Sequence, residues 1–280
     1  HLFGEKGAIS RMQKSGYITN MIFYGPPGTG KTTVAKILAK AVNCENPHDG
    51  EPCGECPTCK SIEAQTSLNV IEIDAASNNG VDNIREIVEE VSFSPAQGRY
   101  KVYIIDEVHM LSTSAFNALL KTLEEPPAHV IFILATIEIR KVPVTILSRC
   151  QRFDLARVPV ETLKKHFAWV AGQEKVALSD EANELLARAA DGSVRDGLSL
   201  LDQAIAQTGG HVDEGAVLDM LKRTDRGTVA NFMKIVLSGD VSAALNKLDD
   251  VSRNNELKNA FKVFKVFILE SLRSLETSQP

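Results

Sequence analysis

Short apolar runs alternate with helix-like patterns along the first half of the chain. The runs have the length and composition of buried β-strands and lie at residues 21–24, 70–73, 102–105 and 130–134. Residues 31–42 and 114–125 instead place apolar side chains every three or four positions, which is typical of amphipathic helices. Alternating strands and helices predict a parallel sheet that is covered by helices on both faces.

The pattern changes near residue 158. No further strand-like run follows, and short amphipathic helical patterns continue to about residue 224. Residues 225–280 are helical again and end in one long apolar stripe, formed by Phe261, Phe264, Ile268, Leu272 and Leu275. We therefore expect an α/β domain over residues 1–158, a small helical domain over 159–224, and a separate helical segment over 225–280.

Composition narrows the class of protein. Of the 280 residues, 31 are Lys or Arg and 36 are Asp or Glu, so the formal net charge is −5. This charge excludes a chain-wide basic surface for nucleic acid, although it allows a local one. No uncharged apolar stretch reaches the roughly 18 residues of a membrane span, and the first residues do not resemble a secretory signal. We predict a soluble, cytoplasmic protein with no membrane partner.

The clearest chemical motif lies between the first predicted strand and the first predicted helix. It has the G-x-x-x-x-G-K-T spacing and consists of Gly25, Pro26, Pro27, Gly28, Thr29, Gly30, Lys31 and Thr32. Glycines at these positions let backbone N–H groups turn toward an anion at a helix N-terminus. We expect Lys31 to reach the β- and γ-phosphates of a nucleotide, the Thr32 hydroxyl to help hold Mg²⁺, and Thr33 to lie at the same site. A plain surface turn is the alternative, and the flanking strand and helix disfavour it.

Two carboxylates end the third predicted strand. Asp106 and Glu107 directly follow the apolar residues 102–105. By itself this pattern usually indicates a helix cap, but beside a phosphate loop it indicates the acidic half of a nucleoside-triphosphatase site. We expect Asp106 to organise Mg²⁺ and Glu107 to polarise the attacking water.

Four cysteines cluster in one loop. Their spacing is Cys44-x8-Cys53-x2-Cys56-x2-Cys59. In a chain without a signal sequence, such clustering favours a metal over disulfides. Four thiolates can surround Zn²⁺ tetrahedrally and leave no position for a substrate water, so the predicted zinc site is structural. His48 is an alternative ligand, and Cys150 is expected to be a small core residue.

Further motifs resemble one protein family. They are DEVHMLS at residues 106–112, FNALLKTLEEPP at 116–127, DAAS at 74–77 and PVTILSRC at 143–150. These motifs are similar to the gamma/tau subunits of bacterial DNA polymerase III, which are ATPases of the AAA+ superfamily and motors of the sliding-clamp loader. The resemblance runs from about residue 20 to 210. It implies an AAA+ P-loop ATPase core with a parallel five-stranded sheet and a zinc module at about residues 44–59, then a helical lid and the start of a helical collar.

The resemblance also implies roles for three further polar residues. Thr136 matches the residue that helps place the hydrolytic water, and Arg149 matches an arginine finger that reaches the ATP of a neighbouring subunit. Arg195 matches a lid arginine that contacts phosphate in its own subunit. Independently, Ser193-x-x-Asp196 is a helix-start pattern, and a cation in a first turn opposes the helix dipole unless it binds an anion.

The implied function is ATP hydrolysis within a holoenzyme whose overall activity is DNA-directed DNA polymerisation, a nucleotidyl transfer. The implied cofactors are ATP, Mg²⁺ and Zn²⁺, and the implied partners are the delta and delta-prime subunits, further gamma/tau copies, the sliding clamp and primer-template DNA. Part of the adenine-contacting segment is expected to precede His1. Residues 78–80 (Asn-Asn-Gly) stand where some relatives carry basic residues, which leaves Arg85 either for a DNA phosphate or for an i,i+4 pair with Glu89.

Two other functions are alternatives. Residues 1–4 and 24–30 also resemble the replication-associated recombination ATPases of the AAA+ superfamily, but the cysteine loop and residues 117–127 argue against that family. A non-hydrolysing clamp-loader scaffold subunit, similar to delta-prime, would share the fold and the zinc module. The complete phosphate-loop and acidic motifs argue against it, because a scaffold need not retain them.

Overall fold

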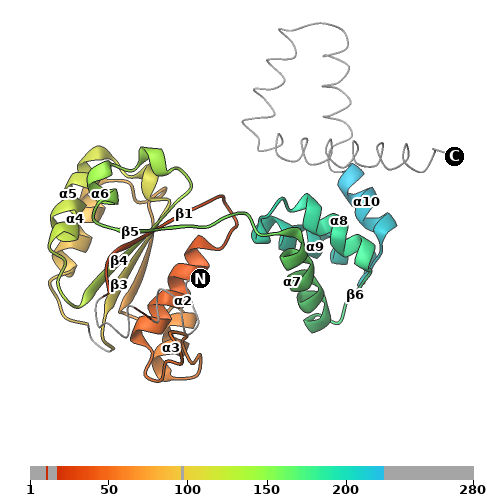
Figure 1. Ribbon diagram of the computed structural model, residues 1–280, viewed down its shortest axis with the longest axis horizontal. Helices are drawn as coiled ribbons and strands as arrows, with labels where there is room; N and C mark the ends of the chain where they lie inside the picture. The colour runs from red at the N-terminus through yellow and green to blue at the C-terminus, as the bar shows by residue number, and fades with distance from the viewer. Residues whose placement is uncertain (1–10, 12–17, 96–97, 224–280) are drawn as a thin grey trace, which may run out of the picture. The chain divides into compact units, whose positions relative to one another are not determined.

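The computed structural model describes residues 11, 18–95 and 98–223, and the chain divides into two compact units between Arg157 and Val158 (Figure 1). The helical segment that we predict over residues 225–280, with its apolar stripe, lies outside the described residues. Within the described part of the chain, no helix is both long enough and apolar enough to cross a membrane.

The first unit contains a parallel sheet of five strands in the order β2-β3-β4-β1-β5 (Figure 1). The strands are β1 (Met21–Tyr24), β2 (Val70–Asp74), β3 (Lys101–Asp106), β4 (Val130–Thr136) and β5 (Gln151–Asp154). The predicted α/β fold with a parallel five-stranded sheet is therefore confirmed. Because the strands run in one direction, their carboxyl ends meet at one edge, which is where loops of such sheets assemble ligand sites.

Helices cover both faces of this sheet (Figure 1). One face carries α4 (Val81–Glu90), α5 (Thr113–Glu124) and α6 (Val144–Leu147), and the other carries α2 (Lys31–Asn43), with α3 (Pro57–Glu63) packed against α2. The helices predicted at residues 31–42 and 114–125 thus match α2 and α5 to within one residue at each end.

Strand β3 shows why the sheet needs helices on both sides. Tyr103 and Ile105 belong to the core under α4 and α5, whereas Val102 and Ile104 belong to the core under α2. Successive side chains of a strand point to opposite faces, so a strand that is buried on both faces reads as one continuous apolar run. This is why the residue pattern predicts β1 to β4 to within two residues at each end.

Strand β5 is different, because its own residues do not predict it. Phe153 packs against the core under α2, while Arg152 and Asp154 are exposed and form an ion pair with 2.6 Å between Nε and Oδ1. An edge strand with one inward-facing side chain has no apolar run to detect. The fifth strand was expected from the family resemblance alone.

The second unit packs helices around a core of its own. Those among the described residues are α7 (Val160–Gln173), α8 (Asp180–Ala189), α9 (Val194–Thr208) and α10 (Glu214–Arg223). Gly197 lets α9 approach α7 closely, since a Cβ atom there would lie 2.2 Å from the ring of Phe167. A side chain at this position would force the two helices apart.

Two very short strands in the second unit differ from the sequence prediction, which has no strand after residue 158. β6 (Ala177–Leu178) and β7 (His211–Val212) pair in parallel, and the Ala177 N–H donates to the Gly210 oxygen at 3.0 Å. Strands of two residues are too short to show a period in the sequence, so only the packing of the helices around them reveals the pairing.

Candidate active site

The phosphate loop connects β1 to α2 at the carboxyl edge of the sheet. Gly28 and Gly30 have φ angles of 73° and 90°, a region that residues with side chains rarely adopt. Gly25 lacks a side chain for another reason, because a Cβ atom there would lie 2.3 Å from the Leu155 backbone oxygen. The Gly25 N–H also donates to the Thr136 backbone oxygen at 3.3 Å. The motif therefore needs glycine both for turn geometry and for close packing against the sheet.

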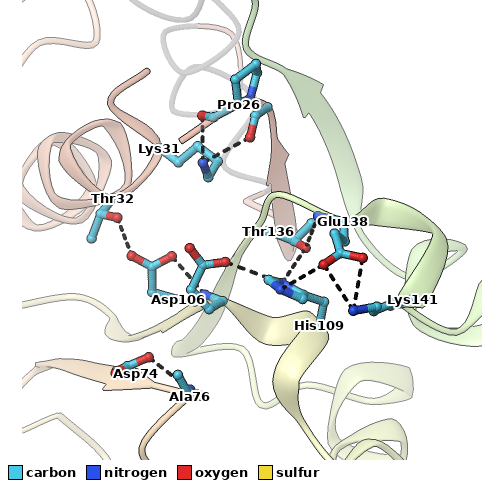
Figure 2. Close-up of polar contacts among 12 residues, drawn as sticks. Pro26, Lys31, Thr32, Asp74, Ala76, Asp106, His109, Thr136, Glu138 and Lys141 are labelled. Atoms are coloured by element: carbon cyan, nitrogen blue, oxygen red, sulfur yellow. Dashed lines mark hydrogen bonds and ion pairs between the residues drawn. The ribbon is translucent and has the colours of Figure 1, made fainter. Parts of the chain in front are cut away.

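The ammonium group of Lys31 is held inside this loop. The residue is buried, and Nζ donates to the backbone oxygens of Gly25 at 3.0 Å and Pro26 at 2.9 Å (Figure 2). The Thr29 hydroxyl donates to the same Pro26 oxygen at 2.8 Å. A buried ammonium needs such acceptors. Its charge and the positive end of the α2 dipole together favour an anion beside the loop.

Thr32 and Asp106 bring the first turn of α2 to the end of β3. The Thr32 hydroxyl donates to Asp106 Oδ2 (Figure 2), although β4 separates β1 from β3 in the sheet. Asp106 Oδ1 accepts the Glu107 backbone N–H at 2.8 Å, and Thr33 is exposed. A hydroxyl beside a carboxylate is a donor set that suits Mg²⁺, so these residues fit the expected ion.

Glu107 follows Asp106 in an unusual backbone conformation. Its φ of 48° lies in the left-handed region, which costs a residue with a side chain about 1–3 kcal/mol and is most often found at functional sites. Burial is the main cause that raises the pKa of its carboxyl group, and the charge of Asp106 raises that pKa further, while His109 and Lys31 oppose the shift. Its carboxylate is therefore poorly solvated, which suits a group that must attract a proton from water.

His109 lies between this carboxylate and the end of β4 (Figure 2). Its Nδ1 is 3.3 Å from Glu107 Oε2 and 3.0 Å from the Thr136 hydroxyl oxygen. Its Nε2 is 3.8 Å from Glu138 Oε1, and that carboxylate is 3.0 Å from Lys141 Nζ. His109 cannot be identified as a site residue from the sequence, because a histidine two positions after an acidic motif has no periodic or spacing signal of its own.

Thr136 is the last residue of β4 and is fully buried. Because β4 lies between β1 and β3, its carboxyl end lies between the phosphate loop and Asp106. The Thr136 hydroxyl accepts the Glu138 N–H at 3.0 Å and contacts His109 (Figure 2). The structure thus brings the predicted water-placing residue to the same edge as Lys31, Thr32, Asp106 and Glu107.

Arg149 follows α6, and its contacts are local. Nη2 is 2.5 Å from Glu124 Oε1 of α5, and Nη1 donates to the Thr145 backbone oxygen at 2.6 Å and to the Ser148 hydroxyl at 3.2 Å. None of these partners belongs to the phosphate loop. In the sequence, Glu124 is noticeable only as part of the motif at residues 116–127. Its contact with Arg149 depends on how α5 and α6 pack.

Arg195 lies in the second unit and is exposed in the first turn of α9. The predicted helix start is confirmed, since the Ser193 hydroxyl accepts the Asp196 N–H at 3.1 Å. The role of Arg195 toward phosphate stays a prediction.

Two further predicted residues have simple surroundings. Arg85 pairs with Asp82 at 3.2 Å and not with Glu89, and both partners are exposed, so the pair contributes about 1 kcal/mol or less. Cys150 is half-buried against the core under α5, as expected of a small core residue, and burial raises the pKa of its thiol to about 12. A DNA contact by Arg85 stays a prediction.

The four clustered cysteines converge on one point. The Sγ atoms of Cys44, Cys53, Cys56 and Cys59 all lie within 4.8 Å of one another. Tetrahedral Zn–S bonds of about 2.3 Å place sulfur atoms about 3.8 Å apart, so this cluster fits a zinc ion after a small contraction. His48 is not part of the group. With four sulfur donors, the arrangement leaves no coordination position for a substrate.

Backbone N–H groups within the loop point at the sulfurs. The N–H of Cys53 donates to Cys44 Sγ at 3.3 Å, that of Cys56 to Cys53 Sγ at 3.3 Å, and that of Cys59 to Cys56 Sγ at 3.4 Å. The Cys56 N–H is the main cause that lowers the pKa of Cys53 to about 6, whereas burial raises the pKa of Cys44 and raises that of Cys59 to about 12. Because burial opposes ionisation of Cys44 and Cys59, their thiolates need a nearby cation, which a zinc ion would supply.

Both units of the chain are similar to known protein families. Residues 7–159 match the family described as DNA polymerase III, delta subunit, and residues 162–210 match the DNA polymerase III clamp loader subunit, ATPase lid domain. The DNA polymerase III subunit tau of Bacillus subtilis is 50% identical over 239 residues, which are 84% of this chain and 41% of that protein. Subunit tau of Escherichia coli is 47% identical over 229 residues, covering 81% of this chain and 36% of that protein.

The chain thus spans about two fifths of the length of these curated relatives. Among solved structures, the RuvB Holliday junction branch migration motor of Thermotoga maritima superposes with a TM-score of 0.59 at 19% identity, covering 82% of this chain and 72% of that chain. At this identity the likeness concerns the fold alone, an α/β unit followed by a helical unit.

Proposed function

The chain belongs to the clamp-loader ATPase family of DNA polymerase III, and we propose that it is the motor part of a gamma/tau subunit. ATP binding would hold the subunits in an arrangement that grips an open sliding clamp and accepts primer-template DNA. Hydrolysis on DNA would then release the clamp closed around the duplex. Its partners would be the delta and delta-prime subunits and further gamma/tau copies, in the bacterial cytoplasm where chromosomal DNA lies.

The observation that supports this proposal is a group of residues suited to ATP hydrolysis at one edge of the sheet. Lys31 is held by the loop that would cradle the phosphates, and Thr32 contacts Asp106 across the sheet. Thr32 and Asp106 would hold Mg²⁺, which supplies positive charge to the β- and γ-phosphate oxygens when it is bound. Lys31 would neutralise the same oxygens, and Glu107 would take the proton of the attacking water.

The remaining residues would complete the site in two ways. Thr136, from the neighbouring strand, would orient the water that Glu107 polarises. Arg149 would act on the nucleotide of a neighbouring subunit, and Arg195 on that of its own chain. The cysteine module would hold one structural zinc ion and take no part in the chemistry.

A scaffold subunit is the second candidate, because the family matched by residues 7–159 is described as a delta subunit. Three features favour the motor: the intact phosphate loop, the Asp106–Glu107 pair, and relatives named tau over more than four fifths of the chain. The RuvB likeness is one of fold and does not favour a recombination motor. Neither matched family domain is described as having a polymerase activity, so we do not propose nucleotidyl transfer for this chain.

Nucleotide binding and turnover test the proposal directly. In Lys31→Ala, ATP affinity should fall about 10- to 100-fold, because a charge-assisted contact with phosphate is lost. In Glu107→Gln, ATP should bind with near wild-type affinity while turnover falls about 10²- to 10⁴-fold, because the amide cannot accept the proton. Equilibrium binding of a fluorescent ATP analogue and phosphate release separate these outcomes.

Lys36→Ala is a matched control, because Lys36 is also on α2 but pairs with Glu72 at the surface. Its binding and turnover should stay near wild type. A wild-type chain that binds no ATP would support the scaffold instead, and wild-type turnover in Glu107→Gln would assign the proton acceptor to another residue.

A further inference from the structure

We infer that His109 is a positioning residue that sets the carboxylate of Glu107 and the hydroxyl of Thr136 relative to each other. The inference rests on the proposed function, because it assumes that Glu107 accepts the proton of the attacking water. It adds a residue with no assigned role to the hydrolytic site. His109 would act through Glu107 and Thr136, without touching the nucleotide.

One ring nitrogen of His109 faces both residues. His109 is 9% exposed, and its Nδ1 faces two site residues that come from different strands: Glu107, which follows β3, and Thr136, which ends β4 (Figure 2). Glu107 Oε2, 3.3 Å away, is buried and has no hydrogen-bond partner among the described residues. A buried carboxylate oxygen needs a donor, and the His109 ring nitrogen faces it.

Glu107 and His109 lie on the same short backbone turn. Glu107 has a φ of 48°, and its backbone oxygen accepts the Met110 N–H at 2.8 Å, which closes the turn over the 3₁₀ helix η1 (Val108–Met110). The backbones of Glu107 and His109 are therefore held in one rigid geometry. What remains adjustable is the direction of the Glu107 side chain, and a partner on the same turn can set it.

The hydrogen bonds of His109 depend on which ring nitrogen carries the proton. When Nδ1 carries the ring proton, it can donate to the Glu107 carboxylate and to the Thr136 oxygen, which also accepts the Glu138 N–H at 3.0 Å. When Nε2 carries it, Nδ1 accepts from the Thr136 hydroxyl and Nε2 faces Glu138. With the proton on Nδ1, Glu107 is drawn toward Thr136. With the proton on Nε2, the Glu107 carboxylate loses its donor. Both patterns use a neutral ring, so no change of net charge is required.

This arrangement predicts where a defect should appear. His109 contacts the proton acceptor and the water-placing residue, and its side chain has no contact with the phosphate loop in the interactions described above. Loss of the ring should therefore lower kcat and leave the nucleotide affinity nearly unchanged. A misplacement of about 1 Å in a catalytic group can cost on the order of 10²-fold in rate, so a fall of about 10- to 100-fold is expected.

Two substitutions of His109 test whether the position of its ring nitrogen matters or only the bulk of its side chain. In His109→Asn, the amide occupies the place of Nδ1 and can donate to Glu107, so turnover should stay within about fivefold of wild type. In His109→Gln, the amide reaches the place of Nε2 instead, and kcat should fall about 10- to 100-fold with the KM for ATP changed less than about threefold. His129→Asn is the control, because His129 precedes β4 at the opposite end and its Nε2 lies 3.2 Å from the Val91 oxygen.

The measurements use the full-length protein assembled with its partner subunits, with thermal unfolding of each variant as a check on folding. The decisive measurement is a double-mutant cycle with Glu107→Gln. If His109 acts through Glu107, then His109→Gln should cost little further turnover in the Glu107→Gln background.

Equal turnover in His109→Gln and wild type, equal losses in the Asn and Gln variants, or full additivity with Glu107→Gln would each overturn the inference. So would a loss that appears in nucleotide affinity and not in kcat. Failure of the proposed function looks different: the wild-type assembly would not hydrolyse ATP, or Glu107→Gln would retain wild-type turnover, and the role of His109 would fall with it.

Discussion

The cysteine module and the nucleotide site lie in the same unit, but they are assembled in opposite ways. The module takes its four sulfurs from one continuous segment, which runs from the end of α2 at Cys44 to the first turn of α3 at Cys59. The nucleotide site takes its groups from the segments at the carboxyl ends of β1, β3 and β4, so Lys31 and Thr136 lie at one edge only because the sheet places those ends together. The module therefore depends on residues that are close in sequence, whereas the site depends on segments that the fold brings together.

The difference shows what holds each region in shape. In the module, backbone N–H groups of the loop point at the sulfurs of the same loop, so its geometry is local and a metal is the natural partner. In the site, the contacts that matter join distant segments, such as Thr32 to Asp106 and His109 to Thr136. We therefore expect the module to lose its structure when its metal is removed. The site should instead lose activity when strand register or a single side chain changes.

Zinc removal should have the largest effect, because structural zinc contributes on the order of 10 kcal/mol in zinc-finger peptides. Elemental analysis of wild-type protein should give one zinc per chain. In Cys56→Ser or after chelation, amide protons of residues 44–63 should exchange rapidly while those of β3 and β4 stay protected. Hydrogen exchange read by mass spectrometry measures both segments in one experiment.

Cys150→Ser is the control, since that thiol lies outside the cluster and should not change the zinc content. A zinc content near zero in the wild type would remove the metal site. A loss of ATP binding together with the zinc would show that the two regions are not independent.

Removal of Arg149, the proposed arginine finger, should have the next largest effect. We expect Arg149→Ala to lower turnover in the assembled complex about 10³- to 10⁵-fold, because the charge it brings to the breaking bond comes from a neighbouring subunit. An isolated chain should hydrolyse slowly with or without Arg149. Mixing Arg149→Ala chains with inactive Lys31→Ala chains should restore some activity at mixed interfaces, measured as phosphate release.

Glu124→Gln tests whether the ion pair restrains the finger. Both side chains are partly exposed, at 30% for Arg149 and 48% for Glu124, and a pair of this kind contributes about 1 kcal/mol or less. Turnover should therefore stay within a few-fold of wild type. No rescue in assemblies that are shown to be mixed, or full activity of a monomeric Arg149→Ala chain, would contradict action in trans.

Substitution of Asn43 should have the smallest effect and probes the connection between the two regions. Asn43 ends α2 directly before Cys44, and its buried Oδ1 accepts the N–H groups of Arg99 at 3.0 Å and Tyr100 at 2.8 Å, next to β3. Asn43→Ala should lower the free energy of unfolding of the first unit by about 1–3 kcal/mol, because two donors lose their acceptor. Denaturant titration followed by hydrogen exchange checks this value.

Asn46→Ala is the matched control, because Asn46 is exposed three positions later. It should change the free energy of unfolding by no more than about 0.5 kcal/mol. If Asn43→Ala were equally neutral, the join between α2 and β3 would not depend on this side chain.

The parts of the protein that could be predicted from the sequence are those whose signal is local. The central strands are continuous apolar runs because both of their faces are buried, and α2 and α5 show helical periodicity because one face of each is buried. The phosphate loop, the Asp106–Glu107 pair and the cysteine spacing are likewise short motifs whose chemistry follows from residue type and separation. The family resemblance added Thr136 and Arg149, which no spacing rule would single out, and it gave a role to Arg195, which the helix-start pattern also marks.

Tertiary structure alone decided the features that depend on which segments become neighbours. Strand β5 has one inward side chain, so its place in the sheet comes from pairing with β1 and not from a pattern of its own. His109 reaches Glu107 and Thr136, Glu124 reaches Arg149, and Arg85 pairs with Asp82 in place of Glu89. A one-dimensional pattern records how far apart two residues are along the chain, whereas a site depends on how the sheet and its helices fold those residues together.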